Sequence, residues 1–358
     1  MRYRTGPSLV FASDKVIFDA LNHSQVPIDL IRQLLFDRGI IVSHKTEKIE
    51  LAYHFSRLTA DYFDNQSIGS KLGRVTKKER VTYTEVKAPL TIEHIKQGAS
   101  PVLKKLEDKG NSVNLTVDGD GVKIFIQYDH IDYTESEFRQ VQPRDAVIEF
   151  IPDDQGNYIV RNTHNNYIDT ATQSIFAGVE AATGKKLPLS QIGLEGFAEA
   201  KVRNRFFEEL IEDIEGFNFD GLTDAYCYKP RSSNGIGVPL GERDADTEKQ
   251  PYVVRVTLKG NEVNKTFMAG DLYKAGYYLV KVVWRMKEKL KDSELIEFEA
   301  QFGEPNSCTG FSYQARCAIV CEDGVATDQK RVIHKAEQDQ YFRLIEAAAR
   351  RAIAKLEA

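Results

Sequence analysis

The chain has 358 residues, a net charge of -5 and a hydrophobic fraction of 42%. This length accommodates about two or three globular domains, and the composition is that of ordinary folded proteins, which excludes extensive disorder. No uncharged apolar run approaches the roughly 20 residues that cross a bilayer, and the first residues lack the apolar stretch of a secretory signal. We therefore expect a soluble, cytoplasmic protein with no membrane partner.

The four cysteines are consistent with a reducing compartment, because they are too few for a disulfide scaffold. Cys308, Cys317 and Cys321 follow the spacing C-x8-C-x3-C, which differs from the paired ligands of structural zinc sites. The seven histidines are dispersed along the chain. The sequence therefore predicts reduced core thiols, no metal site and no cofactor.

Residues 1–70 are predicted to form a small helical module. Ser13 or Asp14 can cap a first helix, Pro27 can open a second that stops at Gly39, and a third begins near Glu47.

A basic linker and a strand are expected at 71–89. Six cations and two glutamates leave a local charge of +4 over the 17 residues from Lys71 to Lys87. The alternating run VTYTEVK, which starts at Val81, is typical of a strand. A cluster of this kind can displace counterions from a nucleic-acid backbone, although a solvated basic loop has the same composition.

Residues 90–187 are predicted to form a mixed domain with two hairpins. A helix begins near Ile92, and the turn sequences DGDG at 118–121 and DDQG at 153–156 each separate two strand-like runs. A further helix ends at Gly184. The polar cluster at 162–166, just after a strand, is expected to build a turn.

Residues 188–358 are predicted to form the last domain. An amphipathic helix at about 195–214 precedes five strands, of which the last three form an antiparallel meander, and a helix at 335–356 closes the domain. The aperiodic segment 229–250 is unusually long for a loop within a compact domain. The fold class is therefore α+β, with a helical module followed by two mixed domains that have mainly antiparallel sheets.

The segment from Leu30 to Leu58 resembles the SAP-type helix-extension-helix motif, a DNA-binding module. An amphipathic helix ends at Arg38-Gly39-Ile40, an extended stretch follows, and a second, lysine-bearing helix ends at Arg57-Leu58. Ser43, His44 and Lys45 replace the glycine-x-lysine step of that family. The resemblance implies phosphate contacts from Arg38, Lys45 and Lys48, supported by the N-terminal amides of the second helix. The same helices also fit an ordinary interaction subdomain.

These two adjacent signals lead to one functional hypothesis. The protein is expected to associate with nucleic acid as a component of a bacterial multi-subunit system, with the mixed domains serving assembly or sensing. The residues expected to contact phosphates come from the helical module and the basic linker: Arg38, Lys45, Lys48, Lys71, Arg74, Lys77, Lys78 and Arg80.

Two alternatives remain open at this stage. The first is a protein-interaction or structural subunit, which would use the C-terminal helix and the Phe206-Phe207 stripe as surfaces. The second is a metal-dependent nuclease, in which Glu85 and Lys87 form an acid-x-lysine step with Asp61 or Asp64 as the further acid. A second set of acids, whose alternation on strands is also typical of a solvated sheet face, comprises Asp220, Asp224, Glu297 and Glu299.

Overall fold

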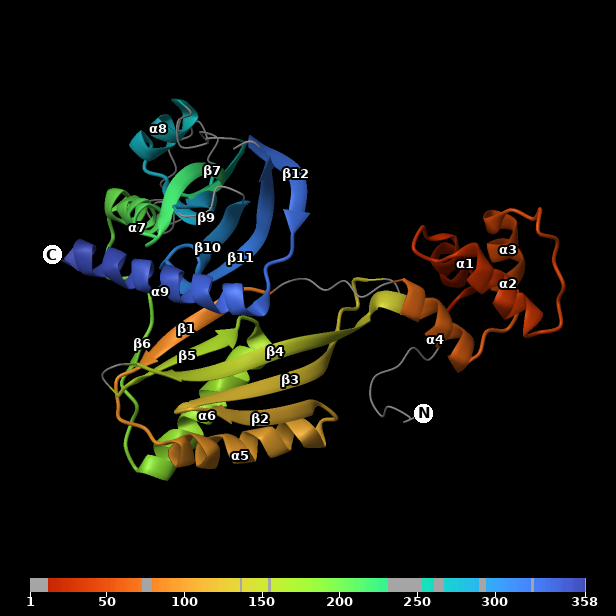
Figure 1. Ribbon diagram of the computed structural model, residues 1–358, viewed down its shortest axis with the longest axis horizontal. Coiled ribbons are helices and arrows are strands. Elements are labelled where there is room, and N and C mark those ends of the chain that lie inside the picture. The colour runs from red at the N-terminus through yellow and green to blue at the C-terminus, as the bar shows by residue number, and fades with distance from the viewer. Residues whose placement is uncertain are drawn as a thin grey trace, which may run out of the picture. The chain divides into compact units, whose positions relative to one another are not determined.

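The computed structural model describes residues 12–72, 79–135, 137–153, 156–230, 253–260, 267–289, 294–322 and 325–357 (Figure 1). Contacts divide the chain into two compact units that do not follow its order. Unit 1 contains Met1–Lys77, Ile92–Ile148 and Ser174–Thr183, and unit 2 contains Lys78–Thr91, Glu149–Gln173 and Gly184–Ala358. Helices and antiparallel strands confirm the α+β class. In the described ranges, no helix has the length and apolar character needed to cross a membrane.

The N-terminal part of unit 1 is a helical module of α1 (Asp14–Asn22), α2 (Ile28–Phe36), α3 (Lys48–Ser56) and α4 (Tyr62–Lys71). Ser13 caps α1, because its hydroxyl accepts a hydrogen bond from the Val16 amide at 3.4 Å. The first three helices confirm the prediction. Their apolar faces meet in a core that includes Leu21, Ile31, Leu51 and Phe55.

Helix α4 was not predicted as a separate element, because Ser67, Gly69 and Ser70 in its sequence are typical of a linker. A capping box forms it instead: the Asp61 carboxylate accepts from the Asp64 amide at 2.9 Å, and the Asp64 carboxylate accepts from the Asp61 amide at 2.9 Å.

The rest of unit 1 consists of α5 (Ile92–Asp108), β2 (Ser112–Asp118), β3 (Gly121–Ile131), the 3-10 turn η1 (Glu137–Arg139), most of β4 (Val141–Pro152) and the C-terminal part of α6 (Asn166–Thr183). The predicted β2–β3 hairpin is present, with Asp118 opposite Gly121. Its turn needs a left-handed residue, which Gly119 supplies at φ 58°. Gly184, at φ 66°, ends α6 as predicted.

In unit 2 the strands are hydrogen-bonded in the order β5-β1-β11-β10-β9-β7-β8, with β6 paired to β1 and β12 to β11. Adjacent strands are antiparallel, and β9, β10 and β11 form the predicted meander. The segment expected to be a linker and a strand therefore supplies β1, which lies between β5 and β11. The strands are β1 (Val81–Val86), β5 (Tyr158–Thr163), β6 (Leu189–Ser190), β7 (Phe217–Tyr228), β8 (Arg255–Lys259), β9 (Tyr278–Glu288), β10 (Glu294–Glu304), β11 (Thr309–Glu322) and β12 (Val325–Arg331).

Two helices of unit 2, α7 (Ala200–Glu212) and α9 (Lys335–Glu357), contribute to the same core as one face of this sheet. Phe206 on α7 and Ile345 on α9 are fully buried with Trp284 and Phe298 of the strands. Phe207 is also fully buried, so the Phe206-Phe207 stripe is core and not the docking surface considered above. The short helix α8 (Phe267–Lys274) was not predicted.

Successive side chains of a strand point to opposite faces of the sheet, so the residues between the core residues lie on the other face. In β10 the core residues Ile296, Phe298, Ala300 and Phe302 alternate with Glu297, Glu299 and Gln301. The face away from α7 and α9 is therefore polar in its centre, and most of the candidate site lies on it.

Candidate functional site

Two of the three phosphate-contact candidates in the helical module have partners inside it. The Arg38 guanidinium forms an ion pair with Asp64 and lies 4.9 Å from the centre of the Phe55 ring. The Lys48 amino group donates to the carbonyl of His23 at 2.7 Å. Lys45 is exposed, and in the described ranges its amino group has no ion-pair partner. Of these three candidates, Lys45 is the one available to an incoming anion.

The connection between α2 and α3 ends at Glu47, the N-cap of α3, which makes no side-chain capping bond. The first amides of α3 therefore lack the side-chain oxygen that usually accepts from them. Glu50 in the first turn brings negative charge close to these amides and weakens their attraction for an anion.

The basic linker is described only at its two ends. Lys71 is exposed as the last residue of α4 and has no ion-pair partner in the described part of the chain. Arg74, Lys77 and Lys78 lie outside the described residues. Arg80 is partly buried, and its Nη1 donates to Oε1 of Glu299 on β10 at 3.1 Å. The linker thus ends on the polar face of the unit 2 sheet.

Glu299 is the centre of a cluster on that face. Its side chain is 4% exposed, and three cations surround it. Besides Arg80, the Lys281 amino group lies 2.9 Å from Oε1 and the Arg316 Nε lies 3.6 Å from Oε2. A buried carboxylate is tolerated only with such compensation.

Glu297 and Asp224 extend the cluster through the same arginine. Arg316 Nη1 lies 3.2 Å from Oε1 of Glu297 and 3.9 Å from Oδ2 of Asp224. Arg285, opposite Glu297 in the strand register, is 3.8 Å from its other oxygen. Four cations thus meet three carboxylates. We call this set the charged sheet face, and its members are Arg80, Asp224, Lys281, Arg285, Glu297, Glu299 and Arg316.

The cluster keeps Glu299 ionised. Burial alone would raise the pKa of its carboxyl group, but the hydrogen bond and charge of Lys281, with hydrogen bonds from Gln314 and Arg80, lower it below the ordinary value. Arg316 is the most accessible cation of the set, with 40% of its side chain exposed.

Several donors at this face remain unused. In the described part of the protein, Nε of Arg80, Nε of Arg285 and the hydroxyl of Ser312 are buried without a hydrogen-bond partner. Ser312 is fully buried and pairs in register with Thr82 of β1 and Gln301 of β10. Unpartnered buried donors are costly to the folded state.

The acids considered for a nuclease do come together in part. Glu297 and Glu299 are buried, not solvated as their alternation suggested, and both contact Arg316. A guanidinium therefore occupies the position between them that a shared metal ion would need. Glu85 is 3.5 Å from Lys87 and 3.7 Å from Arg350. Among the described residues, no group of three or more His, Cys, Asp or Glu side chains is arranged to hold a metal.

The polar cluster at 162–166, expected to build a turn, instead joins the end of β5 directly to the start of α6. Asn165 caps α6 by accepting from the Ile168 amide at 3.0 Å. Asn162 donates to Asp169 at 2.8 Å, and Nδ1 of His164 lies 3.1 Å from the other oxygen of Asp169.

The cysteines are free thiols, and two of them are buried. Burial raises the pKa of Cys227 to about 11, and burial likewise raises the pKa of Cys308 to about 11 against a smaller opposing effect of Arg203. Both are therefore protonated at neutral pH and unsuited to nucleophilic chemistry.

Sequence reasoning missed one buried ionic network. Arg161 on β5 binds Glu346 on α9 through two bonds, Nε to Oε1 at 2.7 Å and Nη2 to Oε2 at 3.0 Å. Its Nη1 donates to Glu149 at 3.2 Å, and the hydroxyl of Tyr313 donates to Glu346. The available signal was a charged residue inside each apolar pattern, YIVRNT and LIEAAAR.

The chain matches no protein-family model and no curated protein sequence.

Proposed function

We propose that this protein binds nucleic acid by contacting phosphates with the basic linker and with the charged sheet face of unit 2. The observation that carries the proposal is the position of Arg80, which is both the last linker cation before β1 and a member of the charged sheet face. A nucleic-acid strand bound to the linker could then also contact the other cations of the charged sheet face.

The chemistry of the face supports phosphate contact. Each guanidinium has more N–H donors than its carboxylate contacts use, and arginine suits phosphate oxygens because its donors lie in one plane. The carboxylates preorganise the cations, so less side-chain entropy is lost when a phosphate binds. Arg316, the most exposed member, is the expected first contact.

Lys45 and Lys71 would add contacts from the helical module. Both side chains are exposed and uncommitted within the described part of the chain. Contacts of this kind position a nucleic acid and contribute affinity, but they carry no base specificity.

The direct test compares the protein with a variant in which Lys71, Arg74, Lys77 and Lys78 are changed to glutamine. Binding to labelled single-stranded and duplex DNA and RNA is measured by fluorescence anisotropy at low salt. We expect the variant to lose at least about tenfold in affinity, since several phosphate contacts disappear together. Arg80 is left intact because Glu299 depends on it.

A matched control removes the same charge elsewhere. Lys104, Lys105, Lys186 and Lys201 are exposed, and their change to glutamine gives the same net charge as the linker variant. This control should bind as the unmodified protein does. Equal loss in both variants would show that only overall charge matters, and absence of binding at low salt would refute the proposal.

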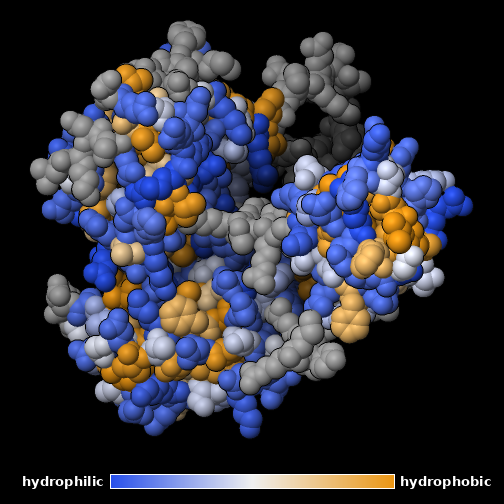
Figure 2. All heavy atoms as spheres, turned by 45° about the vertical axis from the view of Figure 1, so that its right-hand side comes forward, coloured by the Kyte–Doolittle hydropathy of each residue, from blue (hydrophilic) through white to orange (hydrophobic). Residues whose placement is uncertain are grey.

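A second function, contact with a protein partner, is favoured by the surface of the helical module. Figure 2 shows hydrophobic residues gathered on it. Such exposure in a small module marks an interaction surface. The exposed side chains include Phe36 (63%), Ile41 (87%), Ile49 (49%), Tyr53 (52%) and Phe63 (52%).

This second function is compatible with a role in a bacterial multi-subunit system and has its own test. Ile41→Ser and Phe36→Ser should abolish salt-insensitive co-purification with a partner while leaving nucleic-acid binding unchanged. If both variants co-purify with the partner as strongly as the unmodified protein does, the apolar surface is not the partner's binding site.

A further inference from the structure

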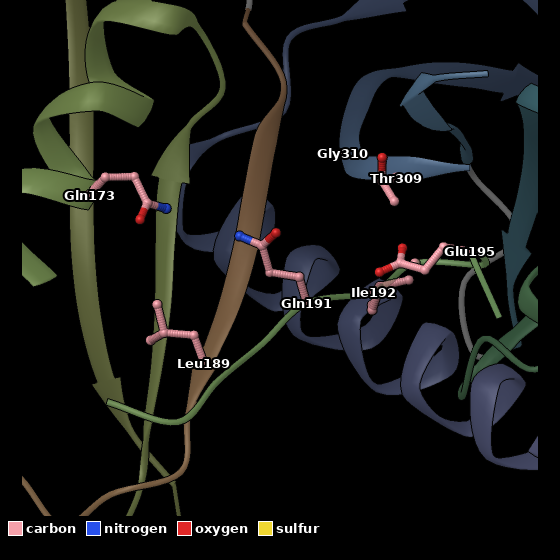
Figure 3. A pocket seen from close by; sticks show the side chains of 8 residues that line it. Gln173, Leu189, Gln191, Ile192, Glu195, Thr309 and Gly310 are labelled. Carbon is pink, nitrogen blue, oxygen red and sulfur yellow. The ribbon is translucent and has the colours of Figure 1, made fainter. Parts of the chain in front are cut away.

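A pocket of about 350 Å³ lies in unit 2, lined by residues of α6, of the segment 189–195 and of the start of β11 (Figure 3). Two apolar side chains, Leu189 and Ile192, form part of its wall. Its polar groups are the amides of Gln173 and Gln191, the carboxylate of Glu195 and the hydroxyl of Thr309. This volume is at the lower end of the range for small-molecule sites.

The strand pairing of β1 creates the opening. On the edge away from β5, Val81 and Thr82 pair with β11, while Glu85 and Val86 pair with β6. Tyr83 and Thr84 lie between these two ladders. The Gln191 amide nitrogen donates to the Thr84 hydroxyl at 2.9 Å, which fixes the side chain and leaves its carbonyl oxygen for another donor.

On the opposite side of the pocket, a glycine leaves room for the carboxylate of Glu195. A β-carbon at Gly193 would lie 2.6 Å from Oε2 of Glu195, so the carboxylate occupies the space that any other residue would fill. Figure 3 shows Gln191 between Gln173 on one side and Glu195 with Thr309 on the other.

The available groups define the chemistry of a ligand. Glu195 is exposed at the pocket and has no ion-pair or hydrogen-bond partner in the described part of the protein, and no cation is among the lining residues. A carboxylate only accepts hydrogen bonds, so it favours a ligand that offers hydrogen-bond donors, and the missing cation disfavours a phosphate inside the pocket. The apolar wall suits the face of a flat ring.

We propose that this pocket binds a nucleobase, with guanine as the preferred base, either in a nucleoside or in a nucleic-acid strand. Guanine presents a ring N–H beside an exocyclic amine, two parallel donors that match the two oxygens of Glu195. Its ring would lie against the apolar wall of the pocket. The inference does not depend on phosphate binding by the charged sheet face.

Guanosine, uridine and spermidine are titrated into the full chain, with binding followed by saturation-transfer NMR. We expect guanosine to bind at least about tenfold more tightly than uridine, which has no exocyclic amine. Equal binding of the two nucleosides, no nucleoside binding, or binding of spermidine in place of guanosine would overturn the proposal.

Three variants test the assignment of Glu195. Glu195→Gln should weaken guanosine binding at least tenfold, because it places donors opposite donors. Gly193→Ala keeps the Glu195 carboxylate but moves it, because the added methyl group takes its place. This variant should therefore weaken guanosine binding as well. Glu199→Gln, an exposed acid outside the pocket, is the matched control and should bind normally. An unchanged affinity in Glu195→Gln would contradict the proposal.

A further arm identifies the source of the base. If the base belongs to a strand, Glu195→Gln weakens binding of a guanine-containing RNA oligonucleotide but not of a guanine-free one. If the ligand is a free nucleoside, only guanosine binding is weakened. Both results support the pocket. Oligonucleotide binding without any nucleoside effect would remove this inference and leave the proposed function intact.

Discussion

At the residue scale, the largest energetic consequences belong to the buried charges of unit 2. Arg161 is 3% exposed and neutralises two carboxylates, Glu346 at 2% and Glu149 at 6% exposure. Arg161→Leu removes the cation that the two buried carboxylates share, and a broken buried pair costs about 3–5 kcal/mol. We expect a loss of that size in the free energy of unfolding measured with urea.

The control for this substitution is a pair at the surface. Lys355 contacts Glu209 at 2.8 Å, and the two side chains are 47% and 22% exposed. Lys355→Met should change stability little, because solvent screens exposed pairs. A similar loss in the two variants would contradict the role assigned to the buried network.

The charged sheet face gives a prediction about acid. Because the folded-state pKa of Glu299 is lowered, its ionised form stabilises the fold above the ordinary carboxyl pKa, and this contribution is lost as the pH falls through the folded value. Glu299→Gln should therefore be destabilised at neutral pH and lose less stability on acidification than the unmodified protein. The free energy of unfolding in urea is measured against pH for both proteins, and the same pH dependence in the two would refute this prediction.

Arg316 tests the same face by binding. Arg316→Gln should weaken binding to all nucleic-acid sequences alike and reduce the salt slope by about one, as expected for one phosphate contact. Arg316→Lys retains the charge and should retain most of the slope. Loss confined to one sequence would indicate base recognition instead.

At the scale of elements, α5 and α6 cross at a point where two glycines meet. A β-carbon at Gly98 would lie 2.5 Å from the backbone nitrogen of Val179, and one at Gly178 would collide with Gly98. Gly98→Ala should therefore destabilise the protein by about 1–3 kcal/mol, the usual cost of overpacking.

Gly69 in α4 is the control for this crossing. A β-carbon there meets only a Phe138 side-chain atom at 3.7 Å. Gly69→Ala should be neutral or slightly stabilising, since alanine favours helix. Thermal unfolding separates the two, and a stabilised Gly98→Ala would contradict the close packing.

Local signals explain which elements were predictable. Ser13, Pro27 and the DGDG turn act within a few residues, and the helices and hairpin that depend on them are present as expected. β12 was missed because its sequence, VATDQKR, is polar and has little alternation. It forms as a partner of β11, an effect of tertiary pairing that composition does not reveal.

The candidate site was predictable only in its parts. Arg80 and the acids at 224, 297 and 299 were identified from sequence as separate groups. Arg80 meets Glu299 across 219 residues of chain, and Arg316 was not identified because a single arginine on a strand gives no local signal. The partners of a buried charge depend on the order of strands in the sheet, and the spacing of residues along the sequence does not predict that order.

At the scale of the whole molecule, the order of elements repeats. The strand, helix, four strands and helix from β1 to α6 are followed by the same order from β6 to α9, with β8, α8 and β12 as additions. The sequence shows no fixed period, because the two halves share the order of their elements and not their residues. The long segment 229–250, which lies almost wholly outside the described residues, precedes the first of these additions.

We propose that cations of the linker and of the charged sheet face bind phosphates. This proposal is tested most directly by the affinity for a labelled single-stranded oligonucleotide at several salt concentrations. We predict that log K falls linearly with log salt by about 0.7 per phosphate contacted, and that the four-residue linker variant has a smaller slope. An affinity independent of salt, or no binding at the lowest salt, would contradict the claim.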